Sequence, residues 1–173
     1  ALQQLRAAFD SAAAGHGRVV LITGEAGIGK TRTAEELAAF ARERGAEVLS
    51  GRCHETAGAP AFWPWVQILR AYSTGRAPAE VLQRMGSGAT DLGPLVPELA
   101  EHLAQPPHPR ATQSDEARFR FFDNLATFLV EASRQRPIVL LLDDLHQSDV
   151  PSLLAIQFVD DLQQKAVAFE IDS

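Results

Sequence analysis

Cysteine is almost absent from this chain, since Cys53 is the only one among its 173 residues. A single thiol cannot form an internal disulfide, which excludes the scaffolds of small disulfide-rich secreted proteins. Long apolar runs are absent too, because none approaches the roughly 20 residues needed to cross a bilayer. No amino-terminal segment has the charged and apolar parts of a signal peptide. These absences favour a cytoplasmic protein that makes no contact with membranes.

Positive charge is scarce as well. Lys and Arg number 16 against 22 Asp and Glu, and the net charge is -6. A broad electrostatic grip on nucleic acid needs a basic surface, so we expect no direct nucleic-acid binding by this chain. The hydrophobic content of 46% and the charged content of 22% are ordinary for a folded protein. The length suits one compact domain.

The apolar pattern predicts alternating helices and strands near the amino terminus. Apolar side chains recur at helical spacing in residues 2–14 and again in residues 31–44. Residues 18–23 form a short apolar run typical of a strand buried on both faces, and residues 46–51 form a second strand. Strand, helix and strand in succession form a βαβ unit with parallel strands and a right-handed crossover. The fold class predicted is therefore α/β.

Gly and Pro punctuate the next part of the chain, which predicts short helices joined by turns in an insertion over about residues 56–113. Residues 65–72 and 79–85 are the better helical pieces, and residues 98–104 are a weaker one. Residues 105–110, QPPHPR, read as an extended linker.

The last third of the chain begins with the longest predicted helix. Ser114 is a typical N-cap, followed by two acids in the first turn of a helix that ends at about residue 134. Residues 137–144, PIVLLLDD, form an apolar strand that ends in two carboxylates, and a final helix is expected over about residues 151–164. The tail, residues 165–173, alternates like a strand.

Residues 24–31, GEAGIGKT, fit the phosphate-binding pattern G-x-x-x-x-G-K-[ST] between a strand and a helix, as that pattern requires. Glycines let successive backbone N–H groups turn inward, and the following helix adds partial positive charge at its N-terminus. We expect Lys30 to reach the β- and γ-phosphates and the Thr31 hydroxyl to coordinate Mg²⁺. The alternative is a glycine-rich turn that only joins strand to helix. The predicted nucleotide-binding residues are Gly24, Glu25, Ala26, Gly27, Ile28, Gly29, Lys30, Thr31 and Arg32.

The strand at residues 137–144 supplies the second half of the site. In a parallel sheet its end lies at the same edge as the phosphate-binding loop, so Asp143 is expected to hold Mg²⁺. Asp144 is expected to act as general base or to orient the attacking water, and with Lys30 it makes up the predicted catalytic residues. The alternative is that one or both acids cap the next turn.

Three stretches together resemble P-loop ATPases of the additional-strand class, close to the AAA-like modules of large bacterial LuxR-type transcriptional regulators and other STAND signalling ATPases. They are LITGEAGIGKTRTAEELA, GRCHETAGAPAFWPW and VLLLDDLHQSD, and the similarity extends to about residue 162. The resemblance implies a three-layer P-loop fold with a mainly parallel sheet and helices on both faces. It implies ATP and Mg²⁺ as ligands, with Lys30 and Thr31 at phosphate and metal, Asp143 at magnesium and Asp144 near the attacking water.

The chain departs from the family pattern in two places. Gln147 and Ser148 stand where the family often has Trp-Ala, so a partner contact by that loop is not carried over. The tail has no evident sensor residue, and the family's arginine finger and helical lid are not found. We therefore expect a single P-loop domain over residues 1–173, cut from a larger regulator and truncated at its C-terminus. Its sheet would expose an edge for pairing with another chain unless the tail fills in.

The expected function is that of an ATP-binding switch, in which slow Mg²⁺-dependent hydrolysis resets a larger regulator. The expected partners are ATP, ADP and the other domains of that regulator, a DNA-binding one among them, and self-association stays open. One alternative is a module that binds nucleotide without hydrolysing it. A small-molecule kinase is less favoured, because no Arg-rich lid is seen. ATP is favoured over GTP because no Asn-Lys-x-Asp stretch occurs.

Several other residues have a structural interpretation that outweighs a functional one. Phe62, Trp63 and Trp65 lie beside prolines and are expected to fill a core or an interface rather than stack on a base. His146 is expected in a turn or core rather than as a γ-phosphate sensor, and Cys53 is expected to be buried and inert. The arginines expected at helix surfaces, with phosphate contact as the alternative, are Arg52, Arg118 and Arg120.

Overall fold

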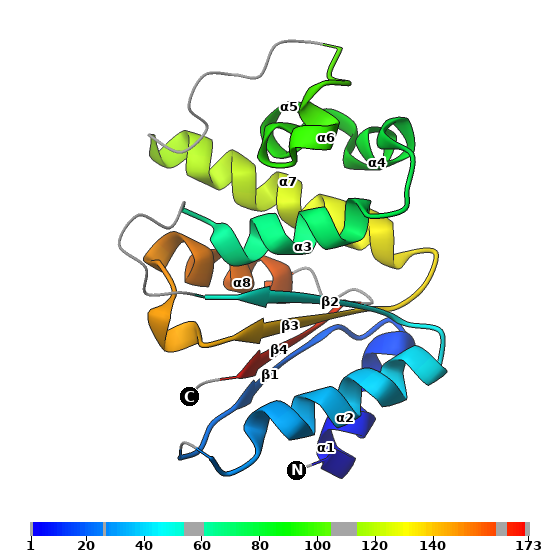
Figure 1. The fold of residues 1–173 in the computed structure, drawn as a ribbon, viewed down its shortest axis with the longest axis vertical. Coiled ribbons are helices and arrows are strands. Elements are labelled where there is room, and N and C mark those ends of the chain that lie inside the picture. Colours follow the sequence, from blue (N-terminus) through cyan, green and yellow to red (C-terminus); the bar gives the residue numbers. More distant parts are fainter. Residues whose placement is uncertain (1, 26, 54–60, 105–113, 162–165, 172–173) are drawn as a thin grey trace.

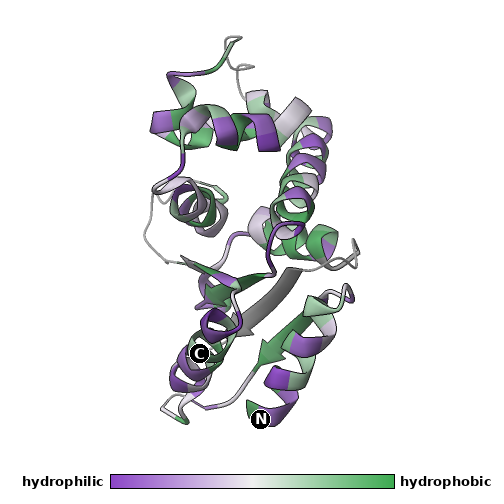
Figure 2. Ribbon diagram, turned by 90° about the vertical axis from the view of Figure 1, so that its right-hand side faces the viewer, coloured by the Kyte–Doolittle hydropathy of each residue, from purple (hydrophilic) through white to green (hydrophobic). Residues whose placement is uncertain are grey.

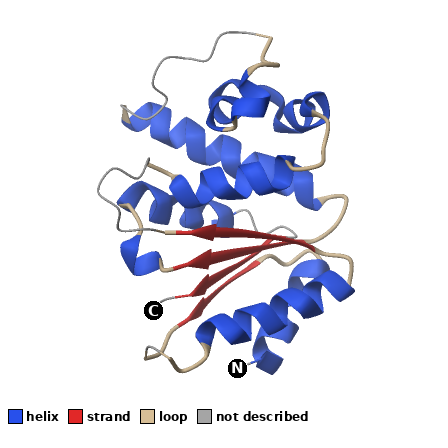
Figure 3. Ribbon diagram, viewed as in Figure 1, coloured by secondary structure: helices blue, strands red, loops and turns tan. Residues whose placement is uncertain are grey.

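In the computed structural model, the described residues are 2–25, 27–53, 61–104, 114–161 and 166–171. Across these ranges a parallel β-sheet of four strands carries helices on both faces (Figure 1). Helices α1 and α2 cover one face, and α3, α7 and α8 cover the other. Helices α4 and α5 pack against α7 on the side away from the sheet, and α6 packs against α4 (Figure 3). The arrangement is the layered α/β fold expected from the sequence.

The elements alternate along the chain much as the apolar pattern indicates. The strands are β1 (Arg18–Ile22), β2 (Glu47–Arg52), β3 (Ile138–Asp143) and β4 (Ala166–Ile171). The longer helices are α1 (Leu2–Ala13), α2 (Lys30–Glu43), α3 (Trp63–Ser73), α4 (Pro78–Met85), α7 (Asp115–Ser133) and α8 (Val150–Asp161). The shortest helices are α5 (Ala89–Leu92) and α6 (Pro97–Ala100), with 3-10 turns at Gly86–Gly88, Gly93–Leu95 and Leu145–Gln147.

The strand order in the sheet is β1-β4-β3-β2, with every neighbouring pair parallel. Strand β4 comes last in the sequence but lies between β1 and β3, and Val167 is in register with both Arg18 and Val139. The tail therefore fills the interior of the sheet. Among the described strands, β1 and β2 form the two edges.

Strand β1 corrects one expectation. Its apolar sequence predicts a strand buried on both faces, but β1 pairs only with β4 among the described strands, and Leu21 is 54% exposed. Val20 and Ile22 instead pack against the small cluster under α1 and α2. The inner strand β3 has the fully buried character that its sequence indicates, since Leu140 is completely buried. Position in the sheet, rather than apolar content, decides which of these strands is covered.

Two hydrophobic clusters lie on the two faces of the sheet. The smaller one joins α1 and α2 to the sheet through Phe9, Leu37 and Val139. The larger one holds α3 and α7 against the other face and includes Trp65 and Phe128, neither of which is exposed. Figure 2 shows the corresponding pattern, with mainly hydrophobic strands and helices that alternate between hydrophobic and hydrophilic residues.

The expected helices are confirmed with small shifts at their ends. Ser114 caps α7 as predicted, because its side-chain oxygen accepts a hydrogen bond from the Ala117 N–H at 3.1 Å. Helix α6 is shorter than the piece expected at residues 98–104, and α5 was not expected. Residues 105–110 lie outside the described residues. Among the helices in the described ranges, none combines the length and apolarity that a membrane span requires.

Candidate nucleotide site

Residues 24–31, called the glycine loop from here on, connect β1 to α2 at the carboxyl edge of the sheet (Figure 1). Gly27 and Gly29 have φ angles of 81° and 97°, in the left-handed region that side chains with a Cβ rarely adopt. Gly29 is also the N-cap of α2. The glycines therefore let the chain turn sharply into the helix N-terminus, as the motif requires. Ala26 lies outside the described residues.

Lys30 is the first residue of α2, and its side chain folds back into the glycine loop. Its Nζ donates to the Gly24 carbonyl at 2.7 Å and to the Glu25 carbonyl at 3.0 Å. Lys30 is only 8% exposed, although Gly24 and Glu25 are themselves exposed. The loop thus encloses an ammonium group. Phosphate oxygens could replace the two carbonyls as acceptors, with the stronger bond that an ionised acceptor gives.

Thr31 and Asp143 reach one shared cavity of about 250 Å³, from α2 and from the end of β3 respectively. Glu35, Ser50 and Gln67 also line it. The described residues contain no group of three or more His, Cys, Asp or Glu side chains that could enclose a metal. A hydroxyl and a carboxylate nonetheless fit Mg²⁺, which takes one or two protein oxygens and completes its shell with phosphate oxygens and water.

Asp144 follows β3 in a left-handed conformation, with φ 59° and ψ 43°, which Asp tolerates better than most residues. Its backbone N–H donates to Asp143 Oδ1 at 3.1 Å. The Asp144 side chain does not cap the 3-10 turn that follows. Its Oδ2 accepts a hydrogen bond from Arg52 Nε at 2.8 Å. The turn Leu145–Gln147 therefore has no side-chain cap hydrogen bond at its N-terminus.

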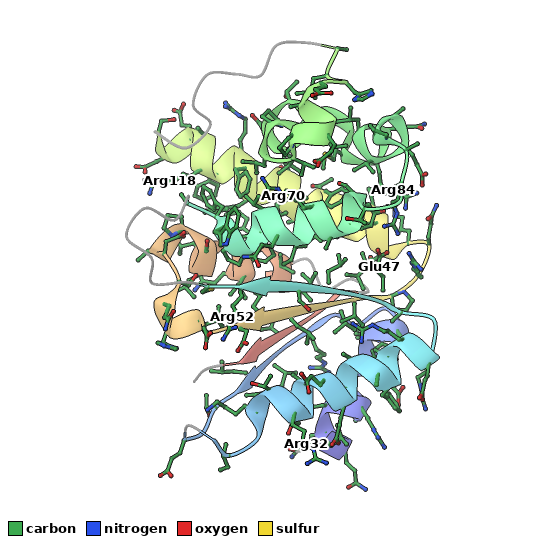
Figure 4. All side chains as sticks on the ribbon, in the orientation of Figure 1. Arg32, Glu47, Arg52, Arg70, Arg84 and Arg118 are labelled. Atoms are coloured by element: carbon green, nitrogen blue, oxygen red, sulfur yellow. The ribbon has the colours of Figure 1, made fainter. Side chains whose placement is uncertain are left out.

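Arg52 does not lie on a helix surface, the position favoured for it from the sequence, with phosphate contact as the alternative. It is the last residue of β2 rather than a helix-surface arginine, and it is in register with Asp143 on the neighbouring strand. Its Nε lies 2.8 Å from Asp144 Oδ2 and 3.9 Å from Asp143 Oδ2. Arg52 is labelled in Figure 4. The hydrogen bond and the charge of Asp144 raise the pKa of the Arg52 guanidinium. Its place at the end of a parallel strand was the signal available in the sequence.

The other two candidate arginines lie elsewhere. Arg118 pairs with Asp115 one turn away on α7, as expected for a helix surface. Arg120 Nε lies 3.7 Å from Asp91 Oδ2, beneath the helices that pack outside α7. Neither lines the cavity shared by Thr31 and Asp143.

Helix α3 holds the backbone of Arg52 in place through the side chain of Gln67. The Gln67 side chain donates from Nε2 to the Arg52 carbonyl at 2.8 Å, and its Oε1 accepts from the Arg52 N–H at 3.3 Å. The helix also lies unusually close to β2, because a Cβ on Gly51 would stand 2.5 Å from the Pro64 carbonyl oxygen. Glycine at this position lets α3 rest directly on the strand that carries Arg52.

The aromatic residues at the start of α3 are structural, as expected for Phe62 and Trp65, which are almost fully buried. Trp65 Nε1 donates to the Ser152 carbonyl of α8 at 3.1 Å. Asp149 Oδ2 accepts from the Phe62 N–H at 3.1 Å, and its Oδ1 accepts from the Ser152 N–H at 2.6 Å. One carboxylate therefore ties the N-termini of α3 and α8 together. Trp63 is partly exposed, with the Arg70 guanidinium 5.5 Å from its ring centre.

Cys53 is buried as expected, and burial raises the pKa of its thiol. Its backbone N–H donates to the Asp143 carbonyl at 2.9 Å, which extends the pairing of β2 with β3 beyond the strand end. His146 is exposed and lies in the turn that follows Asp144.

Comparison with known proteins agrees with this geometry. The family model of the AAA ATPase domain matches residues 1–169, nearly the whole chain. No curated protein and no solved structure matched the sequence of this chain. The matching family generally binds ATP with Mg²⁺ and has a P-loop α/β fold. A match of this extent places the chain in a family as well as in a fold, and we conclude that it belongs to the AAA ATPase domain family.

Proposed function

We propose that this domain binds ATP with Mg²⁺ and serves as a nucleotide-dependent switch that slow hydrolysis resets. The observation that carries the proposal is the placement of the glycine loop, Lys30 and Asp143 at one edge of the sheet, with Thr31 and Asp143 facing the same cavity. An ammonium, a hydroxyl, a carboxylate and a helix N-terminus are the groups that triphosphate and a hard cation require.

Each residue has a distinct task in this proposal. Lys30 Nζ exchanges the Gly24 and Glu25 carbonyls for β- and γ-phosphate oxygens, and the glycine loop and the N-terminus of α2 bind the phosphates through backbone N–H groups. Thr31 and Asp143 would hold Mg²⁺, which would supply neutralising charge to the phosphates. Asp144 orients the water that attacks the γ-phosphate.

The finer family assignment is also a proposal. Strand β4 separates β1 from β3, which supports the additional-strand class of P-loop ATPases. The three sequence stretches described above support an origin in a LuxR-type or related STAND regulator of the cytoplasm. In such a protein the domain would signal to neighbouring domains, a DNA-binding one among them, and would not contact DNA itself. Self-association of the domain would be a further way to transmit the nucleotide state.

Binding is tested by isothermal titration calorimetry with the non-hydrolysable ATP analogue AMPPNP, with and without Mg²⁺. Lys30→Ala removes a charge-assisted contact worth about 1.5–3 kcal/mol, so its dissociation constant should rise by roughly 10- to 150-fold. Its melting temperature should change little, since the two carbonyls released belong to exposed residues that water can reach. Arg70→Ala, an exposed change on α3, is the control. Equal affinities in wild type and Lys30→Ala would refute the phosphate assignment.

Hydrolysis requires a separate measurement, because the alternative is a module that binds ATP without cleaving it. Phosphate release from ATP·Mg²⁺ is followed over hours, with Lys30→Ala as the blank. Release by wild type above that blank supports the resetting reaction. Tight binding of AMPPNP without release would favour the binding module.

A further inference from the structure

We propose that Arg52 bridges Asp144 and the terminal phosphate of the bound nucleotide, so that the domain senses the γ-phosphate from the end of β2. The inference rests on the proposed function, because it needs a triphosphate in the glycine loop. It adds a residue to the site that neither the loop motif nor the acidic strand end contains.

The geometry around Arg52 supports this bridge. Its Nε is engaged by Asp144 Oδ2 at 2.8 Å, whereas its two terminal nitrogens have no hydrogen-bond partner among the described residues. The side chain is 58% exposed, and Arg52 lines the same cavity as Thr31 and Asp143. The guanidinium is a planar fork with five N–H donors that matches phosphate oxygens. The guanidinium can therefore keep the hydrogen bond from Nε to Asp144 while its terminal nitrogens donate to phosphate oxygens.

The backbone of Arg52 is held from two sides, which fixes the point from which its side chain reaches the cavity. Gln67 brackets its N–H and carbonyl, and β2 pairs with β3 in a register that sets Arg52 opposite Asp143. Helix α3 rests on Gly51 with no room for a Cβ. A fixed base and an exposed tip are what a contact with an exchanging ligand requires.

The charge balance of the cavity points to the same ligand. Asp143 and Asp144 carry negative charge at the strand end, Glu35 adds a further carboxylate to the cavity lining, and a γ-phosphate and its metal would lie against the two aspartates. Arg52 is the cation already in contact with Asp144, and its attraction for a third anion offsets the repulsion between phosphate and carboxylate. ADP lacks the γ-phosphate, so Arg52 should contribute to ATP binding and not to ADP binding.

The test compares AMPPNP with ADP, both with Mg²⁺, by calorimetry. Arg52→Gln should weaken AMPPNP binding by about 10- to 100-fold, the loss expected for one charge-assisted hydrogen bond, and change ADP affinity by less than about twofold. Arg52→Lys should recover part of the loss, since an ammonium can contact phosphate but cannot hold Asp144 and phosphate with one planar fork. Arg70→Gln makes the same charge change on the exposed side of α3 and is the control.

A double-mutant cycle separates bridging from a general effect on the fold. Asp144→Asn should weaken AMPPNP binding in the wild-type background and have little effect once Arg52→Gln is present, because both changes break the same chain of contacts. Thermal melting followed by circular dichroism shows whether each variant folds. If Arg52→Gln does not fold, the comparison of AMPPNP with ADP is made with Arg52→Lys. Parallel losses for AMPPNP and ADP, or no loss for either, overturn the inference and leave the proposed function intact. Absence of nucleotide binding by the wild type would overturn both.

Discussion

Gly51→Ala tests the contact on which the position of Arg52 depends. Gly51 lies in β2 and does not have a left-handed φ angle, so alanine meets no backbone strain there. The new Cβ would instead stand 2.5 Å from the Pro64 carbonyl oxygen, 3.0 Å from its carbonyl carbon and 3.1 Å from its Cα. These atoms belong to the backbone and cannot rotate away, so α3 or β2 must move by about an ångström to restore a normal contact.

The expected cost combines two effects of opposite sign. Overpacking of a closely packed site destabilises by about 1–3 kcal/mol. Replacing glycine by alanine stabilises by about 0.4–1 kcal/mol through the unfolded chain. The clash should win, because Phe62 and Trp65 on either side of Pro64 are buried and tied to α8. A net loss of about 1–2 kcal/mol corresponds to a melting temperature lower by roughly 2–8 °C for a domain of this size.

The measurement is thermal and urea unfolding of wild type and Gly51→Ala, with Ser50→Ala as the matched control. Ser50 is the preceding residue of β2 and is exposed, so this control removes one hydroxyl oxygen from the same strand and adds no atom near Pro64. It is a control for stability only, because Ser50 also lines the cavity shared by Thr31 and Asp143. Gly51→Ala should also reduce the preference for AMPPNP over ADP, because a displaced α3 can no longer hold Arg52 in its present position through the two Gln67 hydrogen bonds. Stability within about 0.5 kcal/mol of the control would show that α3 does not lie this close to β2.

Four further outcomes are expected. Asp143→Asn should preserve AMPPNP binding in EDTA and lose the gain from added Mg²⁺, and an unchanged response to magnesium would leave Asp143 as a cap only. Asp149→Ala should lower stability by about 2–4 kcal/mol, from a lost N-cap and an unsatisfied N–H at Phe62; a loss below about 0.5 kcal/mol would contradict the link between α3 and α8. Cys53 should react with iodoacetamide far more slowly in the native protein than in urea, and equal rates would show that it is accessible. Burial raises its pKa, so the unfolded chain releases the thiol proton first and stability should fall as pH rises past the ordinary thiol range; Cys53→Ala should remove that part of the slope.

Local chemistry explains the parts of the structure that the sequence predicted well. The glycine loop is specified by residues next to each other, and its conformation needs glycine at Gly27 and Gly29 whatever the rest of the chain does. The N-cap at Ser114 is equally local. Asp143 was predictable because the end of one apolar parallel strand must lie at the same edge as the loop after another.

The parts that were missed depend on long-range arrangement. The exposure of Leu21 follows from the position of β1 at an edge, which its own apolar sequence does not encode. The contact of Arg52 with Asp144 joins residues 92 positions apart and follows from the register of β2 against β3. The need for glycine at Gly51 comes from its close contact with Pro64, which the sequence around Gly51 does not indicate.

The place of β4 in the sheet has a consequence for how the domain is made. A ribosome releases β1, β2 and β3 before β4, and the strand that joins the first of these to the third is the last to emerge. The glycine loop is therefore synthesised long before β4, the strand that aligns it with the two acids, and until β4 emerges the edge of β1 that β4 covers stays unpaired. Arrested translation products that end before β4 should thus depend on chaperones and bind nucleotide poorly, although they contain every residue of the phosphate-binding motif.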